Sequence, residues 1–371
     1  MNKKVAALVC ACLFIIPAAF VLASKLTRPV FIVDPNGVVN SEVGQRLDEH
    51  FTSIAASDFS GVILVAQGTR VVLSKGYGAA DRKRHIPFTS GTVFDIGSIT
   101  KQFTAAAILK LEMQGKLRVN DKIGQYIADV PADKAAITLH HLLTHSAGFA
   151  NNFGQSDYAP LKRDEFIRLA LVSELKFAPG EGFNYSNIGY SLLGAIIEIV
   201  AQQSYESYLH DNLFRPAGLT ETGYMIPQWN PDEVAVGYAR FGFEWGSALE
   251  KLSGAGGPHW NMVAAAGMLS TVGDLYKWHL ALEGEEVLSR EAKEKFFLPH
   301  LSEHHYGYGW VFSKTRGGAA VIWHDGSNKV CNAHLRRYVG EGAVVIIATN
   351  NEQHQAEKEI LRIDELMFGN D

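Results

Sequence analysis

Hydrophobic positions along the 371-residue chain follow a strand-like period near both ends and a helical period between them. After an opening helix, two apolar runs separated by a glycine-containing turn predict a β-hairpin. The middle of the chain, from Gly115 to about Pro299, favours helices joined by long polar connections. Four strand-like runs and an amphipathic helix follow. The predicted terminal elements are a helix over 41–57, strands over 61–66, 70–77, 309–313, 319–324, 332–338 and 343–349, and a helix over 355–367.

Strands at both ends with helices between them predict an α+β fold, in which one sheet is assembled from the two chain ends and a helical part is inserted. The sheet part is expected at about 41–97 and 300–371, and the helical part at about 98–299. Residues 226–260 contain aromatics and glycines without a stable period, so we predict an extended loop region there. With 47% hydrophobic residues, the chain can bury a large core.

The first 23 residues predict export. Lys3 and Lys4 precede an apolar run over 5–22, and a small residue before Ser24 offers a cleavage site. The same run is nearly long enough for a retained single-span anchor, so a signal peptide and an anchor both stay open. Residues 24–40 are expected to form a tether to a domain over 41–371. We expect a periplasmic or extracellular protein that contacts a membrane only through an uncleaved anchor.

Composition and residue types narrow the function classes. The formal net charge of -5 and the lack of a basic block argue against a nucleic-acid partner. Cys331 is the one cysteine outside the N-terminal segment, so the mature chain has no partner for an internal disulfide. His140, His141 and His145 include a pair at helical spacing, but no glutamate completes a zinc motif. We therefore expect no metal and no cofactor.

A helix over 98–114 is predicted near the first quarter of the chain, because this stretch lacks proline and internal glycine and is followed by Gly115. Apolar side chains occur on most of its sides, which is typical of a buried helix. Ser98 and Lys101 share one face at its start. A desolvated lysine there can accept the serine proton. The structural alternative is a lysine that extends to water. Residues 173–176 have the same Ser-x-x-Lys spacing without an evident role, so the spacing alone is weak evidence.

Two later stretches favour catalysis. Tyr185 and Asn187 lie between a Pro-Gly turn and an apolar helix predicted over 189–202, and capping this helix is the structural alternative for them. Near the C-terminus, a strand is predicted to end at His324, followed by Asp-Gly-Ser over 325–327. A histidine at a strand end can also be purely structural.

The order Ser-x-x-Lys, Tyr-x-Asn and His-x-Gly resembles the serine penicillin-recognising enzymes, in the branch of class C β-lactamases, D-alanyl-D-alanine carboxypeptidases, D-aminopeptidases and related esterases. Residues 142–149, 265–275 and 306–310 look like further segments of that family, so the resemblance extends from about Phe59 to about Asn350. It implies an antiparallel sheet flanked by helices, with the active site where the sheet meets the helical part.

The resemblance also implies roles for the motif residues. Ser98 would be the nucleophile, and Lys101 and Tyr185 would share the role of base in proportions that the sequence leaves open. The backbone N–H groups of Ser98 and Ser327 would stabilise the oxyanion. The substrate-binding residues would be Asn187, His324, Gly326 and Ser327.

The expected activity is acyl transfer from a small-molecule or peptide substrate to water, with D-amino-acid peptides, carboxylic esters or β-lactams as the acyl donors. Most β-lactamases of this group carry lysine where this chain has His324. A histidine with an ordinary pKa of about 6.5 is mostly neutral at pH 7. We therefore rank peptide or ester hydrolysis above efficient β-lactam hydrolysis. The alternative is a poorly turning-over or non-catalytic penicillin-binding or sensor module anchored in the membrane.

Overall fold

The computed structural model describes residues 37–369, except 58, 155, 157, 255, 329 and 353–355. The predicted signal peptide or anchor over 1–23, and the predicted tether through residue 36, lie outside the described residues. Val38 and Val39 were predicted to belong to the tether, but they pair with β3 of the sheet. No helix in the described ranges combines the length and the apolar character needed to span a bilayer.

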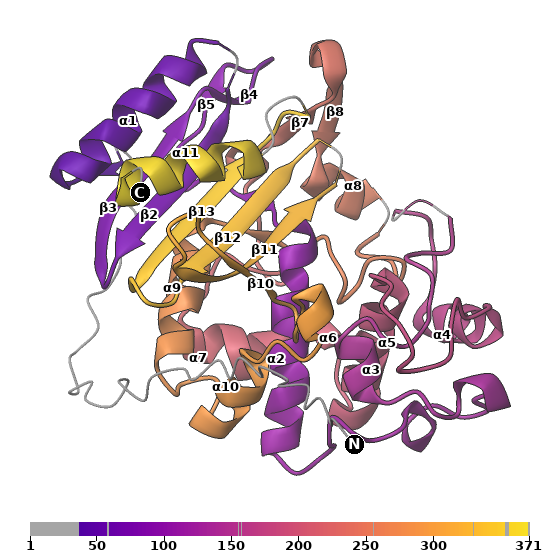
Figure 1. Cartoon of the computed structure of the whole chain (residues 1–371). Helices are drawn as coiled ribbons and strands as arrows, with labels where there is room; N and C mark the ends of the chain where they lie inside the picture. The colour runs from indigo at the N-terminus through magenta and orange to yellow at the C-terminus, as the bar shows by residue number, and fades with distance from the viewer. Residues whose placement is uncertain are drawn as a thin grey trace, which may run out of the picture. The chain divides into compact units, whose positions relative to one another are not determined.

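A seven-stranded antiparallel sheet is the centre of the fold, with the strand order β1-β3-β2-β13-β12-β11-β10. The strands from the N-terminal part of the chain and those from its C-terminal part join where β2 pairs with β13 (Figure 1). The predicted α+β fold with a sheet from both chain ends is thus confirmed. The strands are β1 (Val38–Val39), β2 (Gly61–Gln67), β3 (Arg70–Tyr77), β10 (Val311–Lys314), β11 (Ala320–Ser327), β12 (Asn332–Tyr338) and β13 (Ala343–Thr349).

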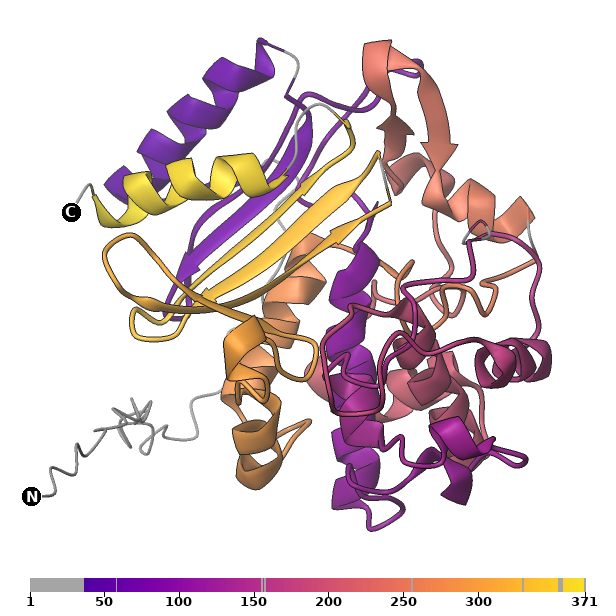
Figure 2. The same ribbon diagram turned by 45° about the vertical axis from the view of Figure 1, so that its right-hand side comes forward.

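Helices cover both faces of this sheet. Figure 2 shows α1 and α11 on one face, where Phe51 of α1 and Ile360 of α11 share a buried cluster with Ile63 and Val345 of the sheet. The helix α9 contacts β2 and β13. Because both faces are covered, β2 and β13 are buried along nearly their whole length, which explains their continuous apolar sequences.

The helix α2 is buried on all sides from Thr100 to Leu109, as its sequence predicted. It ends at Met113, and Gly115 then takes the left-handed conformation with φ +69°. The helices are α1 (Ser41–Ala55), α2 (Thr100–Met113), α3 (Leu139–Leu143), α4 (Arg163–Val172), α5 (Asn187–Ala201), α6 (Tyr205–Leu209), α7 (Arg215–Ala217), α8 (Ala248–Gly254), α9 (Val272–Glu283), α10 (Arg290–Phe296) and α11 (Ala356–Phe368).

The prediction of an extended loop over 226–260 was wrong. This region forms a hairpin of β7 and β8, followed by α8. The two strands have three and four residues, with a bulge after Gly237, so no alternation can be detected in their sequence. The short paired strands are β4 (Ala79–Asp81) with β5 (Ile86–Pro87), β6 (Phe94–Asp95) with β9 (Leu269–Ser270), and β7 (Val236–Tyr238) with β8 (Glu244–Ser247).

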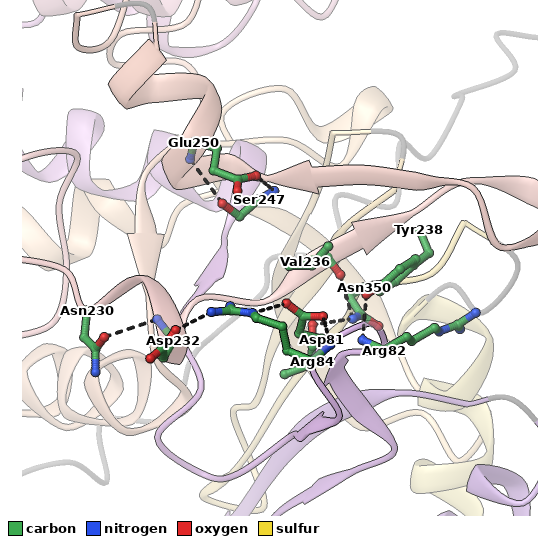
Figure 3. Close-up of polar contacts among 11 residues, drawn as sticks. Asp81, Arg82, Arg84, Asn230, Asp232, Val236, Tyr238, Ser247, Glu250 and Asn350 are labelled. Carbon is green, nitrogen blue, oxygen red and sulfur yellow. Dashed lines mark hydrogen bonds and ion pairs between the residues drawn. The ribbon is translucent and has the colours of Figure 1, made fainter.

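Asn350, just after β13, joins the main sheet to β4 and β7 (Figure 3). Its side chain is fully buried, and its oxygen accepts a hydrogen bond from the Ser60 hydroxyl. Its amide nitrogen donates to the carbonyl oxygens of Ala79 at 3.0 Å, Ala80 at 3.3 Å and Val236 at 2.8 Å. One buried amide therefore links segments that are more than a hundred residues apart in the chain.

We expect Asn350→Ala to lower the free energy of unfolding by about 3 kcal/mol, because a buried hydroxyl and buried carbonyl groups lose their partner. Asn350→Asp should cost more, because a carboxylate has no N–H to donate and would be a buried charge. Urea denaturation measures both changes. The exposed Asn120→Ala serves as the control and should change stability by less than about 0.5 kcal/mol. Wild-type stability of Asn350→Asp would contradict the role of this amide.

Candidate functional site

A cavity of about 390 Å³ lies beside Ser98 at the edge of the sheet. It opens there because β10 pairs with β11 only as far as Trp323, whereas β11 stays paired with β12 to Ser327. The strand thus continues past His324, where the sequence predicted its end. The residues that line the cavity are Ser98, Phe183, Tyr185, His304, Tyr306, Val311, His324, Asp325, Gly326 and Ser327.

Two glycines set the close approach between this strand edge and the segment that carries the serine. Gly97 has φ +48°, and a Cβ there would lie 2.6 Å from the nitrogen of Ser327. A Cβ on Gly326 would lie 2.0 Å from the oxygen of Ile96 and 2.8 Å from the nitrogen of Ser98. A larger residue at either position would therefore separate the two segments. The approach brings the backbone N–H groups of Ser98 and Ser327 into one small region of the cavity.

Lys101 has no solvent-exposed surface. Its Nζ lies 3.1 Å from Ser98 Oγ, 2.8 Å from Asn187 Oδ1 and 2.8 Å from the carbonyl oxygen of Ala265. It also lies over the ring of Tyr185, 4.6 Å from the ring centroid. The lysine therefore does not extend to water, which was the structural alternative for it. Groups from three separate segments converge on its amine.

The three oxygen atoms around the amine differ in the hydrogen bonds that they can form. The oxygens of Asn187 and Ala265 can only accept, whereas the Ser98 hydroxyl can also donate. A neutral lysine amine has two N–H bonds and one lone pair. When its N–H bonds point to Asn187 and Ala265, the lone pair faces the Ser98 hydroxyl. The geometry is therefore suited to proton transfer from Ser98 to Lys101.

Tyr185 and Asn187 flank the residue that caps α5. The cap is Ser186, whose hydroxyl accepts a hydrogen bond from the N–H of Gly189 at 3.1 Å. Asn187 is the first residue of α5 and accepts a hydrogen bond from Lys101, while the side chain of Tyr185 lines the cavity together with Ser98. The segment is not a single extended strand through Asn187. Burial raises the pKa of Tyr185, so its hydroxyl keeps its proton at neutral pH.

The turn that holds the carbonyl of Ala265 is fixed by side chains from several elements. Four consecutive carbonyl groups in this turn each accept a side-chain hydrogen bond, and Ala264 has a left-handed φ of +67°. Such bonds hold the Ala265 oxygen in place for the lysine. The pairs are Ser191 with Val263 (2.8 Å), Thr104 with Ala264 (2.6 Å), Lys101 with Ala265 (2.8 Å) and Tyr224 with Ala266 (2.7 Å).

His324 is nearly completely buried, and both of its ring nitrogens have partners. Its Nδ1 lies 2.6 Å from the backbone oxygen of Asp325, to which it donates, and its Nε2 lies 3.1 Å from the hydroxyl of Tyr306. The same hydroxyl lies 3.1 Å from Nε2 of His145, whose Nδ1 accepts from the N–H of Ser186. A neutral His145 therefore carries its proton on Nε2 and donates to Tyr306, which can donate to His324.

Burial lowers the pKa of His324 to about 4, even though the nearby carboxylate of Asp325 acts in the opposite direction. Burial also lowers the pKa of His145. Both rings are therefore neutral at pH 7. The sequence argument for weak carboxylate binding assumed an ordinary histidine pKa, and the lower pKa extends the neutral state of His324 to more acidic pH.

The structure brings all of the predicted site residues together. Ser98, Tyr185, His324, Gly326 and Ser327 line the cavity, and Lys101 and Asn187 lie behind Ser98. The repeated Ser-Lys spacing has no such surroundings, because the serine donates to the oxygen of Ala170 and the lysine to Asn184. Four further residues at the site lie in stretches that the sequence had marked as family-like, at 142–149, 265–275, 306–310 and in the His-x-Gly motif, but the sequence assigned them no role of their own. They are His145, Ala265, Tyr306 and Asp325.

The three histidines near residue 140 have structural partners. His140 lies 2.8 Å from the Tyr308 hydroxyl, His141 completes a capping box with Thr138, and His145 bonds to Tyr306. In the part of the chain that the structure describes, no group of three or more histidine, cysteine, aspartate or glutamate side chains is placed to hold a metal ion.

Comparison with known proteins decides the family. Residues 47–366 match the β-lactamase family. This chain belongs to the β-lactamase family. It is 26% identical over 332 residues to penicillin-binding protein 4* of Bacillus subtilis (strain 168), with 84% of this chain and 73% of that protein covered. Among solved structures, the octameric penicillin-binding protein homologue from Pyrococcus abyssi has a TM-score of 0.75 and 27% identity, covering 89% of this chain and 78% of that one.

A more distant solved structure shares the fold. The D-amino acid amidase from Ochrobactrum anthropi SV3 has a TM-score of 0.75 at 21% identity, and the match covers 88% of this chain and 99% of that one. The membership in the β-lactamase family and the likeness to penicillin-binding proteins confirm the resemblance that the three sequence motifs indicated. They place the chain among serine hydrolases of the β-lactamase and penicillin-binding class.

His334, opposite Asp325 in the sheet, allows a test of how buried histidines limit stability in acid. Burial lowers its pKa to about 3, and neither ring nitrogen has a hydrogen-bond partner among the described residues. In the unfolded chain a histidine has a pKa of about 6.5. Below that pH the unfolded state binds a proton that the folded state does not, so the contribution of His334 to stability is complete above pH 6.5 and falls as the pH drops toward 3.

We therefore expect His334→Phe to raise the free energy of unfolding by about 2 kcal/mol more at pH 5 than at pH 8, since 1.5 pH units below 6.5 correspond to about that energy. Urea denaturation at the two pH values measures the difference, whatever the packing cost of the larger ring. His305→Asn, at an exposed position with a left-handed φ, is the control and should leave the pH dependence unchanged. An identical pH dependence of His334→Phe and wild type would contradict the prediction.

Proposed function

We propose that this protein is an exported serine hydrolase that forms an acyl-enzyme at Ser98 and acts on D-amino-acid peptides, carboxylic esters or β-lactams. Membership in the β-lactamase family supports the reaction class, and the basic-apolar sequence over 1–23 supports export. The observation that carries the proposal is the fully buried amine of Lys101, 3.1 Å from Ser98 Oγ, with two oxygens that can only accept on its other sides.

In the acylation step, Ser98 Oγ forms a bond to the acyl carbon while its proton passes to Lys101. The negative charge that develops on the acyl oxygen is stabilised by the backbone N–H groups of Ser98 and Ser327, which Gly97 and Gly326 allow to come close together. Each such donor contributes about 3 kcal/mol in acyl-transfer enzymes. The strand edge thus supplies half of the oxyanion site and the nucleophile segment supplies the other half.

Tyr185 completes the proton path to the leaving group. Its side chain lines the cavity together with Ser98, and its hydroxyl keeps its proton because burial raises its pKa. As the bond from the acyl carbon to the leaving group breaks, Tyr185 donates its proton to the leaving group, and the proton that Lys101 accepted from Ser98 then restores the Tyr185 hydroxyl. In deacylation a water molecule takes the place of the leaving group and the proton moves in the reverse direction.

The neutral state of His324 supports peptide and ester substrates over β-lactams. A lysine at this place would put a permanent positive charge in the cavity, whereas His324, with its pKa of about 4, supplies none at neutral pH. The carboxylate of a β-lactam antibiotic therefore has no charged partner at this position. Carboxylic esters, and peptides or amides without a free carboxylate, do not need one.

A fluorophosphonate or fluorescent penicillin probe should label the wild type and fail to label Ser98→Ala. Lys101→Ala should lower the rate of labelling by about 10²- to 10⁴-fold, the usual contribution of a general base. The matched controls are Ser173→Ala and Lys176→Ala, which repeat the Ser-x-x-Lys spacing away from the cavity and should label at the wild-type rate. Labelling of Ser98→Ala at the wild-type rate would refute the assignment of the nucleophile.

Asn187→Asp tests whether Lys101 acts as the neutral base. A carboxylate 2.8 Å from the amine stabilises the protonated form by charge attraction, so less neutral amine is present at a given pH. We expect kcat/KM for a p-nitrophenyl ester to decrease, and its fall toward acidic pH to begin at a higher pH than in the wild type. Asn187→Ala adds no charge and should lower the rate without this displacement. A pH profile of Asn187→Asp that matches the wild type would remove Lys101 from the base role.

A further inference from the structure

The exposed wall of the cavity carries a negative charge that no exposed positive charge of the described lining residues balances. Asp325 is the one carboxylic acid among the described residues that line it. The amine of Lys101 lies beneath the surface and is engaged with oxygens of the protein, and the ring of His324 is neutral at pH 7. A substrate in the cavity therefore meets a carboxylate at the exposed part of the wall.

The carboxylate of Asp325 lies at the exposed part of the cavity wall, beside His324. Its Oδ1 lies 3.9 Å from Nδ1 of His324, and its side chain is 54% exposed. Its negative charge also contributes to the raised pKa values of Tyr185 and Tyr306, which line the same cavity. Among the described residues, no lysine or arginine nitrogen comes within 4.0 Å of this carboxylate. The group is thus accessible to a cation supplied by a substrate.

The distance along the strand fits a small acyl donor. Asp325 and Ser327 are two positions apart on β11, so their Cα atoms lie about 7 Å apart and their side chains point to the same side. An α-ammonium group is two covalent bonds from the acyl carbon, and an ion pair spans up to about 4 Å. An acyl carbon beside Ser327 and an ammonium beside Asp325 can therefore belong to one amino-acid unit.

We propose that Asp325 makes the cavity selective for acyl donors that carry a positively charged group, such as the free α-ammonium of an amino-acid amide or ester, over donors that carry a carboxylate. The inference rests on the proposed acyl transfer at Ser98. It names the class of substrate that this site selects, because the carboxylate attracts a cation and repels the acid group of a β-lactam or of an N-succinylated peptide.

Two fluorophosphonates of the same shape test the selectivity, one with a trimethylammonium group and one with the neutral tert-butyl isostere. With either probe, Ser98 Oγ forms a bond to phosphorus as the P–F bond breaks, fluoride leaves and the hydroxyl proton passes to the base. The wild type should react about tenfold faster with the cationic probe, which corresponds to about 1.4 kcal/mol. In Asp325→Asn, an isosteric change at a half-exposed side chain, the two rates should become equal.

Glu303→Gln is the matched control, because this exposed carboxylate precedes the cavity-lining His304 but does not line the cavity itself. It should keep the wild-type preference. The wild-type preference should also decrease when salt is raised from about 0.05 to about 1 M, since exposed charges are screened, and this readout needs no variant.

A wild type without preference for the cationic probe, an unchanged preference in Asp325→Asn, or a preference that salt does not alter would each overturn the selectivity and leave the acyl transfer standing. Absence of labelling at Ser98 by either probe would instead overturn the proposed function. The two failures are therefore distinguishable in one set of measurements.

Discussion

A buried amine imposes the main constraint on this structure. An amino group removed from water costs several kcal/mol unless oxygen atoms replace its hydration. For Lys101 these oxygens come from Ser98 on its own helix segment, from Asn187 at the start of α5, and from Ala265 in a distant turn. The helical part has to bring these segments together to bury α2, and this same packing places a proton acceptor beside the nucleophile. Stability and chemistry thus depend on the same polar contacts.

A second constraint lies at the boundary between the helical part and the sheet. Gly97 and Gly326 face each other so closely that either Cβ would collide with backbone atoms of the other segment. The shortness of β10 leaves the last residues of β11 beside the nucleophile segment and not beside another strand. Backbone N–H groups are present in every residue, so the oxyanion site needs no special side chains. It needs two segments that can approach to this distance, which the two glycines permit.

Elements with a long, regular apolar pattern can be predicted from the sequence, and short irregular elements cannot. The bounds predicted for β13 agree with the structure because this strand is buried throughout and its sequence is almost entirely apolar. The hairpin of β7 and β8 was missed because strands of three and four residues with a bulge carry no such pattern. The motif residues could be found from their spacing. The carbonyl of Ala265 could not, because a backbone oxygen leaves no trace in the sequence.

The groups that would transfer protons and the group that would select the substrate lie at different depths below the protein surface. Of the groups that would move protons, Lys101 is enclosed by the protein, where hydrogen-bond partners and not solvent control its state, and Tyr185 lines the inner part of the cavity. His324 is also enclosed, and burial keeps it uncharged although Asp325 is its neighbour in the strand. Asp325 itself stays in water, where holding a charge costs little. Alternation along one strand therefore places a neutral ring inside and a carboxylate at the surface, so a change of substrate preference need not disturb the buried reaction groups.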